Sequence, residues 1–272
     1  MRMRKEALTV FRPLPWVYHL RDALGVHMTL LAGDRSALLV DTGYGLYDPW
    51  PQIAALTPLP VTVVCTHAHH DHLLGSRWFS QAYLSETELP RCAGAVGGLQ
   101  RERAVNRARE LGLAITDDEA RAYRNASRAT FAPLRQSEFS LGGISARVIP
   151  MPGHTAGSIG LWVPEQRLLL FGDNLNPVVW LFWEDSLPLS AYVEQMRATL
   201  AIPFEYALCP HDDRLYMRHE VEAYVRGIDR DCVLNAQPVR ISPYEGIATR
   251  SCSPAEGFTL VFDWEKVDGM KG

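Results

Sequence analysis

The stretch VTVVCTHAHHDHLLG, residues 61–75, decides the fold of this chain. It opens with a continuous apolar run that contains three valines, the pattern of a β-strand covered on both faces. Four histidines and one aspartate then lie within the six positions from His67 to His72. We therefore predict a buried strand over 61–66, followed by a loop that carries reactive side chains on a rigid support.

The spacing within this loop favours metal binding. Residues i and i+2 of an extended segment point the same way, so His67 and His69 can coordinate one ion. Asp71 and His72 come where the chain turns towards a helix and can face a second position beside the first. Imidazole and carboxylate groups together suit zinc, iron and manganese. Because one short segment cannot close such a site, distant residues must supply the other ligands.

Further candidate ligands stand at the ends of other predicted strands. These strands are SALLVDTG (36–43), ISARVIPM (144–151), RLLLFGD (167–173) and EYALCP (205–210). The candidates that end or follow them are, in the same order, Asp41, His154, Asp173 and His211. With His67 this makes five strands that end in a potential ligand, which chance does not readily produce.

The set resembles the metallo-β-lactamase-fold superfamily in its order and local context, over roughly residues 25–215. The motifs that carry the resemblance are Asp41, HxHxDH at 67–72, GHT at 153–155, GDN at 172–174 and His211. The resemblance implies an α/β fold (α+β in some schemes), a four-layer αβ/βα sandwich with two mixed β-sheets and the metal site at their edge.

The resemblance also assigns the ligands. His67, His69 and His154 would hold the first ion. Asp71, His72 and His211 would hold the second, and Asp173 would bridge both. Asp41 would be an outer carboxylate that hydrogen-bonds near a ligand to fix its orientation. We also expect a catalytic role for Asp71. The alternative role of this residue is to cap the following helix, because aspartate is a favoured N-cap residue.

A dinuclear site of this kind implies hydrolysis. We expect two divalent ions, zinc in the first place with iron or manganese as alternatives, and a bridging hydroxide that is available at neutral pH. The expected substrate is an ester, thioester, lactone or phosphodiester. A mononuclear iron persulfide dioxygenase, which would use only His67, His154 and Asp173, is an alternative, and a non-catalytic metal-binding module is another.

Several features carry less information. The bridging Asp173 argues against antibiotic hydrolysis, because β-lactamases of this fold generally lack it. His70 falls at the variable position of the motif and is predicted to be a bystander. No role is assigned to His19, His27 or His219. The aromatic stretch VVWLFWED (178–185) fits a substrate pocket, core packing or a contact between subunits.

We predict a single domain over 1–272 with two additions. The first is a helical insert at about 85–133. It has capping-box patterns at 85–88 and 116–119 and Arg-rich helices at 99–111 and 117–131, whose faces we expect to be solvated. The second is a strand-rich C-terminal extension at about 232–272, with strands at 239–247 and 256–264. Between them we expect a strand at 158–163 and helices at about 190–200 and 219–227.

Composition sets the remaining bounds. The net charge of −4 offers no broad attraction for nucleic acid or for an anionic membrane. There is no secretory signal or apolar span, and the five cysteines are scattered with no CxxC. We expect a cytoplasmic protein that acts on a small molecule, without nucleic-acid or membrane partners. Whether the C-terminal strands pair with a second copy to form a homo-oligomer stays open.

Overall fold

The structure is a computed structural model that describes residues 7–127 and 129–270. Its contacts divide the chain into two compact units, Met1–Arg147 and Val148–Gly272, which are described in turn. Helices and mixed sheets occur in both units, which confirms the predicted α/β class. The prediction of one domain stays a prediction.

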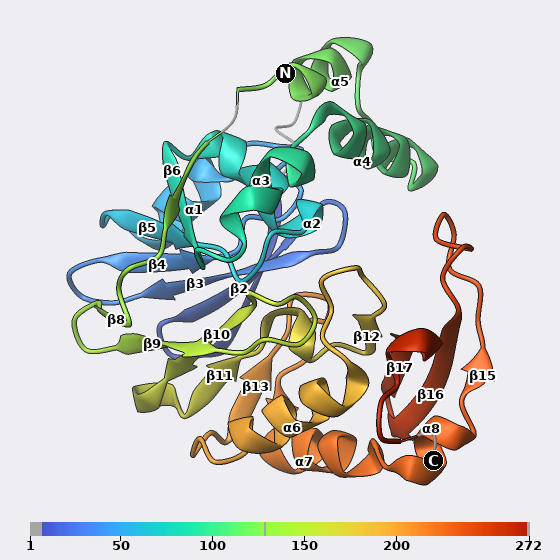
Figure 1. Cartoon of the computed structure of the whole chain (residues 1–272). Helices are drawn as coiled ribbons and strands as arrows, with labels where there is room; N and C mark the ends of the chain where they lie inside the picture. Colours follow the sequence, from blue (N-terminus) through green and yellow to red (C-terminus); the bar gives the residue numbers. More distant parts are fainter. Residues whose placement is uncertain (1–6, 128, 271–272) are drawn as a thin grey trace. The chain divides into compact units, whose positions relative to one another are not determined.

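The first unit is built on a seven-stranded sheet whose strands follow one another in chain order (Figure 1). The strands are β1 Leu8–Leu14, β2 Val17–Asp22, β3 His27–Ala32, β4 Ala37–Val40, β5 Val61–Val64, β6 Gln81–Leu84 and β7 Thr130–Pro133. Strands β1 to β4 pair antiparallel and β4 to β7 pair parallel. The predicted strands at 36–43 and 61–66 are confirmed as β4 and β5. Strands β1 and β2 were not predicted.

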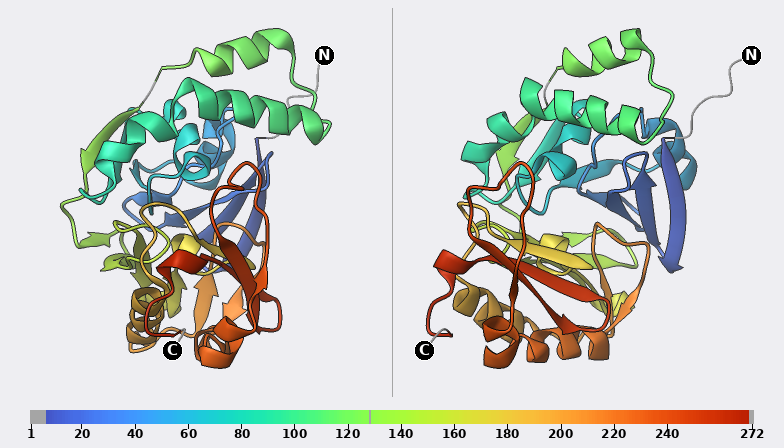
Figure 2. Two further views of the ribbon diagram at one scale, coloured as in Figure 1. Left: turned by 45° about the vertical axis from the view of Figure 1, so that its right-hand side comes forward. Right: turned by 90° about the vertical axis from the view of Figure 1, so that its right-hand side faces the viewer.

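Helical segments connect the parallel strands of this unit. They are α1 Trp50–Leu56, α2 His70–Leu73, the 3-10 turn η1 Leu74–Trp78, α3 Leu89–Ala95, α4 Gly98–Glu110 and α5 Asp117–Arg124. Both views in Figure 2 draw α4 and α5 side by side, and the two helices are in contact. Arg101 of α4 is buried, and its guanidinium donates to the carbonyls of Tyr123 and Ala126 at the end of α5. This arginine therefore holds the insert together, whereas Arg107 and Arg109 are exposed as predicted.

Two details of the predicted insert are wrong and one is right. The pattern at 85–88 starts no capped helix there, because α3 begins only at Leu89 and Glu88 makes no side-chain cap bond. The helix predicted over 117–131 ends at Arg124, and the chain then returns to the sheet as β7. The capping box at 116–119 is confirmed: the Thr116 hydroxyl accepts from the Glu119 amide, and the Glu119 carboxylate accepts from the Thr116 amide.

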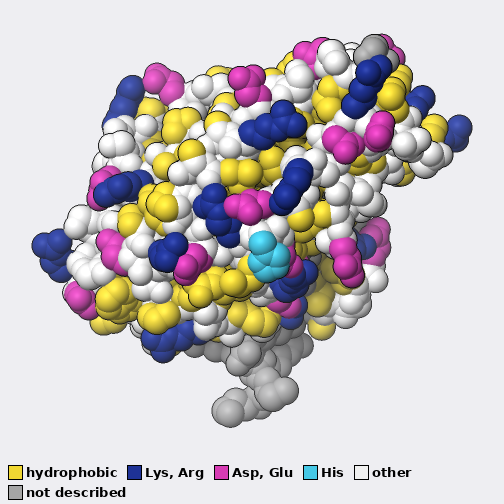
Figure 3. Space-filling model, turned by 90° about the horizontal axis from the view of Figure 1, so that it is seen from below, with side chains coloured by type: hydrophobic (Ala, Val, Ile, Leu, Met, Phe, Trp, Pro, Cys, Tyr) yellow, Lys and Arg dark blue, Asp and Glu magenta, His cyan; other side chains and the backbone are white. Residues whose placement is uncertain are grey.

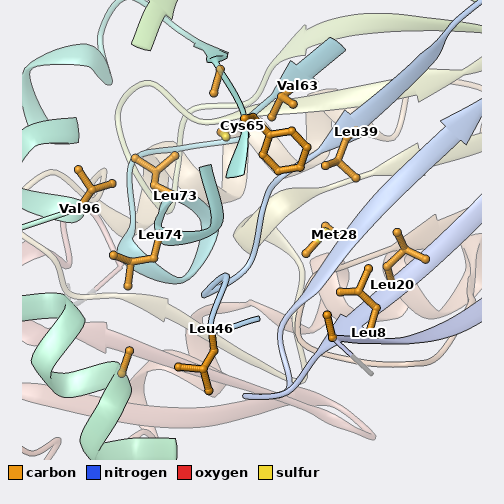
Figure 4. Packing of buried hydrophobic residues seen from close by; sticks show 14 of the residues in the cluster. Leu8, Leu20, Met28, Leu39, Leu46, Val63, Cys65, Leu73, Leu74 and Val96 are labelled. Carbon is orange, nitrogen blue, oxygen red and sulfur yellow. The ribbon is translucent and has the colours of Figure 1, made fainter. Parts of the chain in front are cut away.

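A buried apolar layer joins the sheet of the first unit to the segment after the histidine loop. Figure 4 shows Met28 and Leu39 from the sheet in the same layer as Leu73 and Leu74, and all four belong to one buried cluster. Leu73 is fully buried and Leu74 nearly so. Burial of a leucine side chain contributes about 1.5–3 kcal/mol, so the LL pair fixes α2 firmly against the sheet.

The second unit begins inside strand β9 Ser145–Pro150, whose first residues pair with β8 Glu138–Ser140 of the first unit. Its main sheet has the order β14-β13-β11-β10-β9. The other elements of this part are β10 Ile159–Val163, η2 Pro164–Gln166, β11 Leu168–Leu170, η3 Gly172–Asn174, α6 Leu189–Thr199, β13 Tyr206–Leu208, β14 Tyr216–Met217 and α7 Arg218–Gly227. Strand β11 pairs antiparallel with β10 and parallel with β13. The strands and helices predicted here are confirmed.

The C-terminal extension forms a third sheet with the order β12-β17-β16-β15. Its strands are β12 Val178–Leu181, β15 Gln237–Pro238, β16 Thr249–Ala255 and β17 Phe258–Asp263, and the helical segments of this part of the chain are α8 Arg230–Leu234 and η4 Trp264–Lys266. The predicted strand at 256–264 is confirmed as β17, but the one at 239–247 is wrong. Its Ser-Pro and Glu-Gly pairs favour turns, and the strand that pairs with β17 starts only at Thr249. Strand β12, from the aromatic stretch, completes this sheet in parallel with β17.

The core of the second unit lies between its helices and these strands. It includes the buried rings of Phe171, Tyr192, Phe204 and Tyr224. The hydroxyls of Tyr192 and Tyr224 lie 2.8 Å apart, and the Tyr192 hydroxyl also donates to the carbonyl of Asn174 at 2.7 Å. The η3 turn, which contains Asp173, is thereby tied to helix α6. Among the described residues of both units, no helix is long and apolar enough to cross a membrane.

Candidate metal centre

The histidine loop connects β5 to α2, as the sequence predicts. His69 occupies the N-cap position of α2 in an extended conformation, and its carbonyl accepts from the amides of His72 and Leu73. Asp71 lies in the first turn of the helix. The alternative that Asp71 serves as the N-cap is therefore wrong.

The imidazole rings of this loop converge. The His67 ring lies 4.6 Å from the His69 ring and 4.2 Å from the His72 ring, between centroids. The side chains of His67 and His72 are fully buried. One ligand atom of His67 lies within 4.8 Å of one of His69, and the same holds for Asp71 and His72. Three rings and a carboxylate thus present their ligand atoms within one small volume.

Asp41 fixes the orientation of the His72 ring. Its Oδ2 accepts a hydrogen bond from His72 Nδ1 at 3.0 Å, and both groups are buried. A carboxylate acceptor places the imidazole proton on Nδ1, so that Nε2 presents its lone pair as a metal ligand. Asp41 also accepts from the amide and hydroxyl of Thr66. The orienting contact predicted for Asp41 is present, and its φ of 63° is a left-handed conformation that aspartate tolerates better than most residues.

The DTG segment that contains Asp41 also supports the backbone of α2. The amide and hydroxyl of Thr42 donate to the His72 carbonyl at 3.0 and 2.7 Å. The amide of Gly75 donates to the Gly43 carbonyl at 2.9 Å. A Cβ atom on Gly75 would lie 1.8 Å from the Thr42 carbonyl oxygen, so only glycine fits at the end of the THAHHDHLLG run.

Glu88 is a supporting residue that the sequence did not reveal. It is fully buried, and its Oε2 accepts from the amide of Ala68 at 2.8 Å. Ala68 stands between His67 and His69, so this carboxylate holds the backbone between the two predicted ligands. No sequence signal distinguishes such a glutamate from a helix cap, because its burial depends on contacts with residues far away in the chain.

His70 differs from its neighbours, as predicted. Its side chain is 30% exposed, against 0% for His72. Its ring meets the edge of the Tyr44 ring at 5.6 Å, and its Nδ1 lies 3.7 Å from Asp71 Oδ1. His70 starts helix α2 and belongs to neither group of candidate ligand atoms among the described residues, which supports its assignment as a bystander.

In the second unit, Asp173 stands between two histidines. Its Oδ2 lies 3.5 Å from His154 Nε2, and its Oδ1 lies 3.3 Å from His211 Nε2. Each carboxylate oxygen therefore faces a different imidazole. The three residues follow the ends of β9, β11 and β13, so the strand ends bring these three candidate ligands together, as predicted.

These separations fit ligands that share a metal ion. Two ligands held at about 2.0–2.1 Å around one tetrahedral ion lie about 3.4 Å apart, whereas a direct hydrogen bond from imidazole nitrogen is about 2.7–3.2 Å. The distances of 3.5 and 3.3 Å around Asp173 match the first value better. The donor set of imidazoles and carboxylates also suits zinc, iron or manganese. The residues therefore fit the divalent ions that the ligand pattern implies.

The loop of His154 is fixed by its own set of contacts. His154 Nδ1 donates to the Trp180 carbonyl at 2.7 Å, which presents Nε2 towards Asp173. The His154 amide donates to Asn174 Oδ1 at 2.9 Å, and the Ser186 hydroxyl donates to the His154 carbonyl at 2.7 Å. A Cβ on Gly153 would lie 2.4 Å from Asn174 Oδ1. Asn174 and Ser186 were not predicted as site residues, although Asn174 belongs to the GDN motif.

The aromatic stretch combines core packing with a half-exposed cluster. Val179 and Leu181 are buried, whereas the rings of Trp180, Trp183 and Tyr244 are partly exposed and in contact. The Lys266 ammonium donates to the carbonyls of residues 183, 184 and 186 at 2.5, 2.9 and 3.1 Å. This lysine thereby fixes the loop whose Ser186 holds His154.

Cys65 and Cys209 are buried, and neither belongs to the groups of candidate ligand atoms among the described residues. Burial raises the pKa of the Cys65 thiol well above its usual range, and the charge of Asp41 adds to the effect. Burial likewise raises the pKa of Cys209. A thiol must ionise to bind a metal or attack a substrate, so neither residue competes with the histidines.

Comparison with known proteins identifies the family. The model of the metallo-beta-lactamase superfamily matches residues 21–211. The chain is 28% identical over 184 residues to the acyl-coenzyme A thioesterase MBLAC2 of Gallus gallus, covering 60% of this chain and 62% of the relative. It is 24% identical over 157 residues to a probable metallo-hydrolase of Streptococcus pyogenes serotype M6, covering 56% and 62%. The chain thus spans 62% of the length of each of these relatives.

Solved structures share the fold at low sequence identity. The DIM-1 metallo-beta-lactamase has a TM-score of 0.53 at 15% identity, with 79% of this chain and 94% of that chain covered. TTHA1623 in a di-iron-bound form has a TM-score of 0.52 at 23% identity, covering 80% and 97%. The sec-alkylsulfatase Pisa1 from Pseudomonas sp. has a TM-score of 0.60 at 15% identity, covering 81% and 40%. Because the family model matches most of its length, this chain belongs to the metallo-beta-lactamase superfamily.

Proposed function

We propose that this chain is a metal-dependent hydrolase with a dinuclear centre. In this proposal His67, His69 and His154 hold one ion, and Asp71, His72 and His211 hold the other. The carboxylate of Asp173 binds both. The observation that carries the proposal is the placement of Asp173, whose two oxygens face the Nε2 atoms of two different histidines at 3.5 and 3.3 Å.

Divalent ions bound here would supply a nucleophile derived from water at neutral pH and would polarise the electrophilic oxygen of the substrate. The chain's own residues hold and orient the ligands. Asp41 keeps the His72 proton on Nδ1, and the Trp180 carbonyl does the same for His154. Asp71, whose Oδ2 lies 3.8 Å from His72 Nε2, is proposed both as a ligand and as the acceptor of a proton from the attacking water.

Among the four substrate classes that the sequence left open, we place thioesters first, then esters, lactones and phosphodiesters. The support is the similarity to a relative named as an acyl-coenzyme A thioesterase. That similarity covers 60% of this chain at 28% identity. The acyl group and the carrier of the thioester are therefore extended to this chain as a proposal.

A small-molecule substrate fits the surface charge better than nucleic acid does. On the face that Figure 3 draws, acidic and basic side chains are interspersed, with no broad field of one sign. The net charge of −4 points the same way. A nucleic-acid partner would call for a basic stripe or patch.

The test is a substrate panel on metal-loaded protein. Matched acyl thioester, oxygen ester, lactone and phosphodiester substrates would be assayed with the wild-type chain and with Asp173→Asn. We expect hydrolysis of the thioester above the others, and a loss of at least about 100-fold in the variant, because it removes the shared carboxylate. Oxygen consumption with a persulfide, with one iron per chain and no hydrolysis, would replace the proposal by the dioxygenase. Bound metal with no turnover of any substrate would replace it by the non-catalytic module.

A further inference from the structure

Cys232 and Cys252 stand apart from the other cysteines of the chain. Cys65, Cys92 and Cys209 are buried, whereas Cys232 and Cys252 are partly exposed. Cys232 lies in helix α8 and Cys252 in strand β16, and both line one open cleft of about 460 Å³. The other residues of that cleft are polar: Asp231, Asn235, Gln237, Ser251 and Ser253. None of these residues belongs to the candidate metal centre.

Several contacts hold the two cysteine-bearing segments together. Helix α8 packs against β16, and β15, which follows the helix directly, pairs with β16 through Gln237 and Ser251. The Arg250 guanidinium donates to the Ala236 carbonyl at 3.3 Å. Residues 232–237 are therefore fixed against residues 250–252 before any covalent bond is formed. The Cys232 and Cys252 side chains stand on these two segments and line the same cleft.

The two thiols are chemically unequal. The hydrogen bond from Cys252 lowers the pKa of Cys232, while the same bond and burial raise the pKa of Cys252. A thiolate is the form that attacks disulfides, so Cys232 is the attacking group and Cys252 is the second thiol beside it. This is the arrangement of a reactive cysteine next to a resolving one.

We propose that Cys232 and Cys252 form a redox-active dithiol that low-molecular-weight disulfides convert into a disulfide between α8 and β16. The Cys232 thiolate attacks one sulfur of the small disulfide, forms a mixed disulfide and releases one small thiolate. Cys252 then loses its proton and attacks Cys232 Sγ, which releases the second small thiolate. The pair is oxidised by two electrons, and the small disulfide is reduced to two thiols.

Oxidation would close a covalent loop over residues 232–252. This loop contains β15 and the turn-rich segment 239–248, which carries Tyr244 of the aromatic cluster. The proposal concerns the cysteine pair itself and does not depend on the metal centre or on the substrate.

The test uses the full-length protein and oxidised glutathione as the small disulfide. After reaction, remaining thiols are alkylated and the chain is digested with trypsin without reduction. Cleavage after Arg230, Arg240, Arg250 and Lys266 places Cys232 on peptide 231–240 and Cys252 on peptide 251–266. We expect these two peptides to be linked, with a loss of two hydrogens that dithiothreitol reverses. Cys65, Cys92 and Cys209, alkylated only after unfolding, serve as internal controls.

Two variants separate a true pair from two independent thiols. In Cys252→Ser, reaction at Cys232 should stop at the mixed disulfide with glutathione. In Cys232→Ser, Cys252 should react at least about tenfold more slowly than Cys232 does in the wild type, since its thiolate is disfavoured. A mixed disulfide on the wild-type chain without linked peptides would overturn the proposal. So would equal reaction rates of the two thiols in the single variants, or no reaction of either.

Discussion

The histidine loop and the Asp173 cluster supply the proposed metal ligands in opposite ways. The loop concentrates its candidates in six consecutive positions, His67 to His72. The Asp173 cluster draws His154, Asp173 and His211 from three separate strand ends. One histidine of the loop, His70, is not among the proposed ligands, so the number of histidines in the loop overstates the number of ligands. In the dispersed cluster every residue comes from its own strand, and Asp173 faces both histidines.

The two regions also orient their histidines by different chemical groups. In the loop, the Asp41 side chain accepts the hydrogen bond from His72 Nδ1. In the dispersed cluster, a backbone carbonyl, that of Trp180, accepts from His154 Nδ1. A side chain can be removed by substitution, but a carbonyl cannot. The two regions should therefore respond differently to substitutions just outside the ligands.

The largest loss of bound metal and activity is expected for a substitution in the histidine loop. His69→Ala should lose most bound metal, with a fall in activity of at least about 100-fold, because a ligand is removed from the first ion. His70→Ala is the matched control and should keep both properties, since His70 is partly exposed and belongs to neither group of candidate ligand atoms among the described residues. Metal content after dialysis and the hydrolysis rate would be measured for both. Equal losses in the two variants would show that the ligand assignment is wrong.

Glycine substitution should break the packing of the loop on the DTG segment. Gly75→Ala places a Cβ 1.8 Å from the Thr42 carbonyl oxygen, so backbone must move and stability should fall by about 3 kcal/mol. Gly98→Ala in α4 meets open space and should be neutral or stabilising by about 0.5–1 kcal/mol. Urea denaturation of both variants would give the two free energies. A tolerated Gly75→Ala would mean that the loop is not seated on Thr42 as described.

Asp41 and Trp180 test the two ways of orienting a histidine. Asp41→Asn should weaken metal binding by about 10–100-fold, because the neutral amide holds His72 Nδ1 less strongly. Trp180→Ala keeps the carbonyl that accepts from His154, so metal affinity should change little. Competition with a chromophoric chelator would measure both affinities. If the tryptophan variant loses more affinity than the aspartate variant, the ring and not the carbonyl orients His154.

The smallest effect on metal binding is expected for substitution of Lys266. Lys266→Met removes the ammonium that donates to three carbonyls of residues 183–186, and should cost about 1–3 kcal/mol of stability. Because the Ser186 hydroxyl holds the His154 carbonyl, metal affinity should fall modestly as well. Lys266→Arg, which keeps a cation, should recover part of both losses. Thermal unfolding with and without metal would separate the effect on the fold from the effect on the site.

Sequence patterns predicted what depends on local order. Ligands at strand ends, the capping box at Thr116 and helix α6 all follow from runs of a few residues. The supporting residues Glu88 and Asn174 were missed because their partners, Ala68 and His154, are 20 residues away in the sequence. Strand β16 was also missed. Its sequence TRSCSPA is polar, and it becomes a strand through pairing with the apolar β17.

The proposal that Asp173 binds two ions is tested by the metal stoichiometry of the chain. The purified chain would be loaded with zinc, dialysed and analysed by inductively coupled plasma mass spectrometry, beside Asp173→Asn and His211→Ala. We expect two ions per chain for the wild type, one for His211→Ala and fewer than two for Asp173→Asn. One ion per wild-type chain, unchanged by His211→Ala, would contradict it.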